Sequence, residues 1–141
     1  AVFYKEIWDD IDVMNKWPLS ASDSTADSIV EAATSSDSAL IITLTATGTS
    51  ARLISKYRPR CPIMVLADDE HVGAACNLHR GCFPYLYPNP RAPNDEDVRF
   101  AYAITLAKEE KLLRSGDSVV LAHGSKSGTG SLSSFRIVLI K

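Results

Sequence analysis

Residues 45–50, with the sequence TATGTS, place four hydroxyl side chains around a single glycine. The set comprises Thr45, Ala46, Thr47, Gly48, Thr49 and Ser50. It follows a short apolar run and precedes a basic helical pattern, so free backbone N–H groups and the positive end of a helix favour an anion there. Gly48 lets the backbone approach closely or adopt a positive φ. The hypothesis is a phosphate-binding turn that is not a P-loop; the alternative is that Thr45, Thr47 or Thr49 only caps the helix.

Two further features could add positive charge to such a site. The stretch GSKSGTGS combines flexible glycines with one mobile cation, and its candidate residues are Lys126, Gly128 and Gly130. Its alternative is an ordinary flexible hairpin connection. Arg99 stands among acids in the first turns of a long helix, and its alternative is a solvated salt bridge of small value.

Other groupings give no catalytic or metal-site assignment. His71, His79 and His123 are far apart in sequence and lack metal-ligand spacing, which favours surface or capping roles. Asp68, Asp69 and Glu70 are explained by a dipole role at a helix start. No nucleophile elbow and no acid/base pair is found, so we predict no catalytic residue.

The elements that would position these residues are read from hydrophobic periodicity and turn signals. Helices are predicted over residues 1–14, from a capping box at Ser24 and Asp27 through Ala33, and over 49–57, 68–81 and 95–113. In the last of these we expect one face formed by Val98, Ala101, Tyr102, Thr105 and Leu106. Buried strands are predicted over residues 39–44, 62–67, 82–88, 118–123 and 135–140, and the prolines of the third suggest a sheet edge.

This alternation predicts an α/β fold with three layers (α/β/α) and a five-stranded, mostly parallel mixed sheet. The last two strands follow each other without a helix, so we expect the last strand to be antiparallel. In such sheets ligands bind outside the carboxyl ends of the parallel strands. Both glycine-hydroxyl loops follow strand ends and could share that edge.

The chain has 141 residues, 45% hydrophobic residues and a formal net charge of −2, typical of one globular domain spanning residues 1–141. The charge gives no general attraction to nucleic acid or membrane. Cys61, Cys76 and Cys82 are expected to be reduced core residues in a cytoplasmic protein without a membrane span or signal peptide. A start without methionine, in a helical pattern, leads us to expect a domain excised from a longer chain.

Taken together, several motifs resemble the C-terminal domain of pyruvate kinase. They are TATGTSARLI, SKYRPRCPIMVLA, LHRGCFPYLYP and LLRSGDSVVL, and the resemblance extends over nearly the whole chain. It implies a regulatory domain that binds a sugar phosphate, commonly fructose 1,6-bisphosphate, with the 6-phosphate in the turn from Thr45 to Ser50. The second phosphate would meet Arg99, and the effector loop would correspond to residues 124–134. A family tryptophan is replaced by Ala92 and a bulky aromatic by Ser125, which indicates an altered second site.

The resemblance also implies what this chain lacks. Phosphoryl transfer from phosphoenolpyruvate to ADP, with Mg and K, belongs to a separate (β/α)₈ barrel of roughly 250 residues, so the isolated domain is expected to be inactive and to need no cofactor. Expected partners are that barrel and identical subunits of a tetramer. Fructose 2,6-bisphosphate or a sugar monophosphate is an alternative effector. Loss of regulation is another alternative, leaving an oligomerisation module or a free-standing domain with another ligand.

Overall fold

The computed structural model describes residues 21–45, 48–89, 95–124 and 132–141. The helix predicted over residues 1–14 lies outside these ranges. The described helices are α2 (Ala21–Ser35), α3 (Thr49–Lys56), α4 (Glu70–Cys76) and α5 (Glu96–Glu109). The strands are β1 (Leu40–Thr45), β2 (Ile63–Ala67), β3 (Cys82–Leu86), β4 (Ser118–Gly124) and β5 (Leu132–Leu139). None of these helices combines the length and apolarity that crossing a bilayer requires.

The strands form one sheet in the order β3-β2-β1-β4-β5. β1 lies parallel to β2 and β4, β2 lies parallel to β3, and β4 pairs with β5 in the antiparallel sense. The predicted α/β fold with its final antiparallel strand is therefore confirmed. Pro84 lies in β3 at the sheet edge, where its missing N–H costs no ladder hydrogen bond on the open side.

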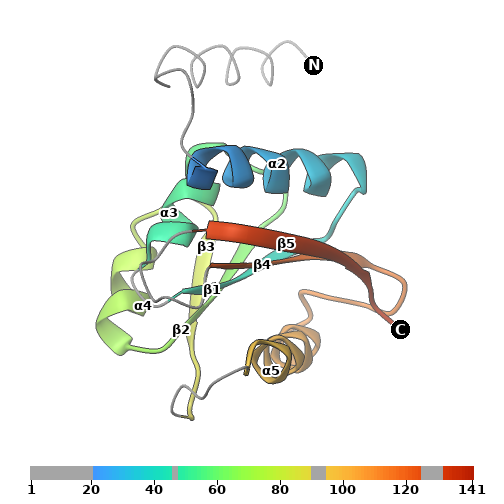
Figure 1. Ribbon diagram of the computed structural model, residues 1–141. Helices are drawn as coiled ribbons and strands as arrows, with labels where there is room; N and C mark the ends of the chain where they lie inside the picture. Colours follow the sequence, from blue (N-terminus) through green and yellow to red (C-terminus); the bar gives the residue numbers. More distant parts are fainter. Residues whose placement is uncertain (1–20, 46–47, 90–94, 125–131) are drawn as a thin grey trace.

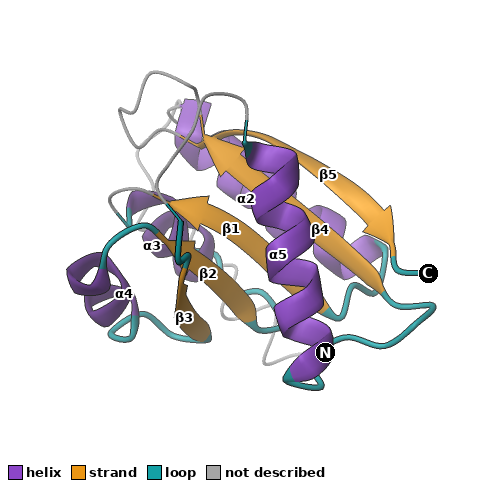
Figure 2. Cartoon of the chain, turned by 90° about the horizontal axis from the view of Figure 1, so that it is seen from below, coloured by secondary structure: helices purple, strands orange, loops and turns teal. Residues whose placement is uncertain are grey.

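Helices cover both faces of the sheet and make three layers. Figure 1 shows α2, α3 and α4 on one face and α5 on the other, and Figure 2 shows α5 lying across its face of the sheet. Neighbouring residues of β1 point to opposite faces, so Ile41 packs in the core with α2 and α3 and Ile42 packs in the core with α5. Burial on both faces explains why β1 and β2 read as unbroken apolar runs.

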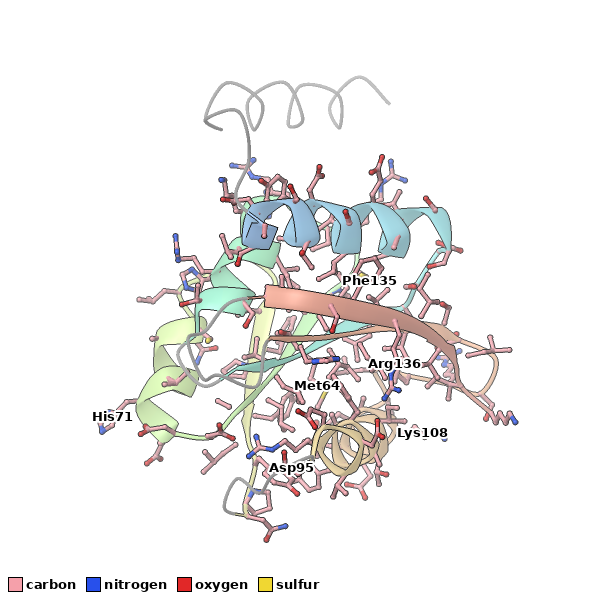
Figure 3. The ribbon with its side chains drawn as sticks, in the orientation of Figure 1. Met64, His71, Asp95, Lys108, Phe135 and Arg136 are labelled. Atoms are coloured by element: carbon pink, nitrogen blue, oxygen red, sulfur yellow. The ribbon has the colours of Figure 1, made fainter. Side chains whose placement is uncertain are left out.

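The predicted apolar face of α5 is right only in part: Tyr102 and Leu106 pack against the core, but the most buried face lies elsewhere. The buried residues of this helix are Arg99, Phe100, Ala103 and Ala107, whereas Val98 is 61% exposed. Alanines and aliphatic residues occur all around the helix, so the apolar pattern fits two different faces. The face that is buried contains a charged residue, Arg99, which the apolar pattern does not count. Figure 3 shows Met64 extending from β2 toward α5, within the core on this face.

The start predicted for α2 is also wrong, because Ser24 lies within the helix rather than at its cap. The Ser28 hydroxyl donates to the carbonyl oxygen of Ser24 at 2.8 Å, and Thr25 bonds to Ala21 in the same way. Hydroxyl residues inside a helix often satisfy themselves on the preceding turn, so the spacing alone does not define a cap. α4 likewise ends earlier than predicted, at Cys76, and Gly81 follows in a turn with φ of 75°.

The three cysteines are free thiols, of which Cys76 and Cys82 are buried, as expected for core residues. Burial raises the pKa of Cys76, and it raises the pKa of Cys61 and Cys82 to about 11. A rise of about two units reduces the thiolate fraction by roughly 100-fold. At pH 8 we expect iodoacetamide to alkylate Cys61 and Cys82 about 100-fold more slowly in the folded chain than in urea, as followed by mass spectrometry. Equal rates in the two states would contradict this prediction.

Candidate functional site at the carboxyl edge of the sheet

The candidate site lies where β1 and β2 end. Thr45, the last residue of β1, pairs with Ala67, the last residue of β2. The chain then continues from β1 into the hydroxyl turn and from β2 into Asp68. Because the strands are parallel, both continuations emerge at the same edge of the sheet.

Gly48 occupies the N-cap position of α3 and adopts φ of 86°, in the left-handed region that favours glycine. A Cβ atom there would lie 3.4 Å from Cys76 Sγ and 3.7 Å from Val72 Cγ1, so α4 packs against this residue. The N-cap residue is therefore Gly48, while Thr45 belongs to β1 and Thr49 is the first residue of α3. Thr47 lies outside the described residues, so the alternative of a threonine cap stays untested for it.

The described part of the turn brings Gly48, Thr49 and Ser50 to the first turn of α3. Ser50 is only 3% exposed and Thr49 is half-buried. Ala46 and Thr47 lie outside the described residues, and of Thr45 the structure describes the backbone. A glycine-capped helix start at a strand end retains the dipole that favours an anion.

Arg99 lies at the same edge and is only 1% exposed. Its Nε donates to Asp95 Oδ2 at 2.8 Å, its Nη1 donates to Asp68 Oδ1, and its guanidinium lies 4.6 Å from the centre of the Tyr87 ring. Burial lowers its pKa, but the hydrogen bonds and charges of the two carboxylates outweigh burial and leave the pKa raised. The alternative of a solvated surface salt bridge is therefore wrong.

The third guanidinium nitrogen of Arg99 differs from the other two in its hydrogen bonding. Nη2 is buried and has no hydrogen-bond partner among the described residues. A buried donor without a partner costs stability, so this atom identifies a place where an additional acceptor would be favourable.

The second predicted loop begins close to this arginine. Lys126, Gly128 and Gly130 lie outside the described residues, but the strands that flank them are defined. At the base of the loop, Ser134 Oγ lies 2.9 Å from His123 Nε2, and the His123 ring lies 6.0 Å from that of Phe100, the neighbour of Arg99. The start of α5 and the base of the predicted effector loop are therefore adjacent.

Sequence reasoning missed two residues of the site, Asp68 and Tyr87. Asp68 was assigned only a helix-dipole role, whereas the cap is Asp69, which accepts a hydrogen bond from the His71 N–H at 2.7 Å. The signal that could have found Asp68 is its position directly after β2. Figure 3 shows Asp95 at the start of α5, and His71 pointing outward from α4.

Within residues 21–45, 48–89, 95–124 and 132–141, no three His, Cys, Asp or Glu side chains are grouped so that they could hold a metal ion.

A mostly parallel sheet covered by helices on both faces, with a glycine-capped helix start and a buried arginine at its carboxyl edge, defines a three-layer α/β domain. The family model described as "Pyruvate kinase, alpha/beta domain" matches residues 23–138, and the chain belongs to this family. Among curated relatives, the pyruvate kinase of Agaricus bisporus is 31% identical over 99% of this chain. That of Hypocrea jecorina is 36% identical over 96%, and pyruvate kinase 2 of Saccharomyces cerevisiae is 34% identical over 97%. The chain spans 26–28% of the length of these relatives.

Proposed function

We propose that this chain is the regulatory domain of a glycolytic pyruvate kinase of the cytoplasm and that it binds a sugar-phosphate effector of the fructose 1,6-bisphosphate type. The 6-phosphate occupies the turn from Thr45 to Ser50, and the second phosphate lies near Arg99. Catalysis belongs to a barrel domain elsewhere in the enzyme. The effector acts by binding one quaternary state more tightly than the other.

The observation that carries this proposal is the pairing of the Gly48 helix start with a buried arginine at one sheet edge. The backbone N–H groups of a helix start suit one phosphate, and the spare donor on Arg99 Nη2 suits another. The relatives are pyruvate kinases over nearly the full length of this chain, which supports the enzyme context.

One observation favours a second candidate function, an oligomerisation module with a degenerate effector pocket. Asp68 and Asp95 both engage Arg99, so a phosphate must compete with two carboxylates for it. Repulsion between these carboxylates and a phosphate would lower affinity for the second phosphate. Under this reading a sugar monophosphate binds at the turn as well as a bisphosphate does, or neither binds.

Calorimetric titration of the chain with fructose 1,6-bisphosphate tests the proposal. Each hydrogen bond to a charged phosphate contributes about 1.5–3 kcal/mol, so a Thr47→Ala, Ser50→Ala double variant is expected to weaken binding by about 100-fold. Titration with fructose 6-phosphate shows whether the second phosphate adds affinity.

The matched control is Ser35→Ala, Thr105→Ala, which removes the same two residue types from exposed helix positions. It is expected to bind like the unaltered chain. If millimolar bisphosphate produces no heat with the unaltered chain, the effector assignment is contradicted and the oligomerisation module is favoured. Equal loss in both double variants would place the ligand elsewhere.

A further inference from the structure

A hollow lies at the opposite, amino-terminal edge of the sheet, where the chain enters β2 and β3. It has a volume of about 220 Å³, and its lining includes Arg58, Arg60, Cys61, Arg80, Gly81 and Phe83. The five residues of β2 separate it from the carboxyl edge, a distance of about 15 Å at the rise of a strand. It is therefore distinct from the site of the hydroxyl turn.

Hydrogen bonds hold together the two segments that supply the arginines. The Ser55 hydroxyl, on α3, donates to the carbonyl oxygen of Arg80 at 2.8 Å. The Ile63 N–H donates to the carbonyl oxygen of Gly81 at 2.8 Å. Pro59 and Pro62 also line the hollow and restrict the backbone between Arg58 and β2. The walls are thus fixed by the backbone, while the guanidinium groups are carried on exposed side chains.

The charged residues that line the hollow are all positive. Among the described residues, its lining contains three arginines and no acidic residue, although the whole chain has a formal net charge of −2. The side chains of Arg58 and Arg80 form no ion pair with any residue in the described part of the chain. By contrast, Lys56, Arg99 and Arg136 each pair with an aspartate. Clustered guanidinium groups in a concave site attract an oxyanion with several acceptor oxygens.

We propose that this hollow is a second anion site, for a ligand that carries a diphosphate group. Water occupies about 30 Å³ per molecule, so the volume equals roughly seven waters and admits two linked phosphates. Guanidinium groups contributed by two segments can each hold a different phosphate in the bidentate manner. The half-exposed Phe83 ring forms an apolar wall beside them. A concave site of this size is better suited to a small ligand than to a protein partner, whose interacting surface is usually flat.

Titration of the 141-residue chain with inorganic pyrophosphate, followed by calorimetry and amide NMR, tests the proposal. We expect binding that weakens with added salt, with shifts at Gly81 and Phe83 that persist in the Thr47→Ala, Ser50→Ala variant. An Arg58→Gln, Arg80→Gln variant is expected to lose affinity by at least about tenfold, since each arginine supplies charge-assisted hydrogen bonds. The charge-matched control is Lys111→Gln, Arg114→Gln, at exposed positions after α5, and it should bind within about twofold of the unaltered chain.

Three results would overturn the proposal. One is the absence of binding at millimolar pyrophosphate, which is also the result if this face instead docks against an acidic protein surface. Another is equal weakening in the two variants, which indicates general charge attraction. The third is a set of shifts confined to Gly48–Ser50, which assigns the anion to the carboxyl edge. The Thr47→Ala, Ser50→Ala variant should still bind pyrophosphate, so failure of this proposal and failure of the proposed function are distinguishable.

Discussion

Replacing Arg99 with methionine is expected to lower the free energy of unfolding by about 3 kcal/mol, because it removes the buried cation that contacts both Asp68 and Asp95. For a chain of this size the melting temperature should fall by about 10 °C. The side chain of Arg99 is 1% exposed, and those of Asp68 and Asp95 are 24% and 14% exposed. The loss therefore sits at the lower end of the range for buried ion pairs. Urea unfolding followed by circular dichroism measures it.

Arg136→Met is the matched control for this prediction. Arg136 Nη2 lies 2.6 Å from Asp97 Oδ1 and its guanidinium lies 5.7 Å from the centre of the Phe100 ring, so its contacts resemble those of Arg99. Figure 3 shows Arg136 on the α5 side of β5. Its ion pair is exposed, with side chains 52% and 83% accessible, and its loss should cost less than about 1 kcal/mol.

A double variant separates the charge from the packing of Arg99. Adding Asp68→Asn to Arg99→Met removes one of the two negative charges that Arg99 contacts and should recover about 1 kcal/mol. Equal losses for the Arg99 and Arg136 variants would show that burial does not determine the cost. A neutral or stabilising Arg99→Met would show that water replaces the arginine at both carboxylates.

The fold could be predicted from the sequence because its determinants are local. A strand buried on both faces gives a short apolar run, and a helix between two such runs requires a parallel crossover. Gly48 could be found in the same way, because a strand-to-helix turn often needs a positive φ, which glycine adopts readily. The order of elements, the edge position of β3 and the antiparallel last strand all follow from signals of this kind.

The errors and omissions concern contacts between distant residues. Asp68 meets Arg99 across 31 positions, and neither residue signals the other in the sequence. Once Arg99 is buried by this pair, the buried stripe of α5 passes through a charged residue, which the periodicity of apolar residues cannot show. The error at the start of α2 has a different, local cause: the hydroxyl groups bond to the preceding turn of their own helix, so the spacing of Ser24 and Asp27 does not distinguish a cap from a helix interior. The pairing of Asp68 with Arg99, by contrast, is decided by the assembled fold.

Subunits of the proposed regulatory domain are expected to associate through β5. β5 forms one edge of the sheet, and its Ile137 and Leu139 are 50% and 65% exposed on the same face. An unpaired strand edge with apolar side chains can pair with a second copy about a two-fold axis. We therefore expect the chain to dimerise at micromolar concentration, with a mass twice that of the 15.3 kDa chain by sedimentation.

An Ile137→Lys, Leu139→Lys variant is expected to weaken this dimer by at least about 100-fold, because two like charges would meet their symmetry copies in a desolvated interface. The matched control is Leu78→Lys, Val98→Lys, which changes two apolar residues that are at least 61% exposed and lie outside β5. The control should remain dimeric. Disruption by both variants would place the contact elsewhere, and a monomeric unaltered chain would contradict association through β5. If the β5 variant is monomeric and still binds the effector, one chain supplies a complete effector site and the interface serves only to transmit the change between subunits.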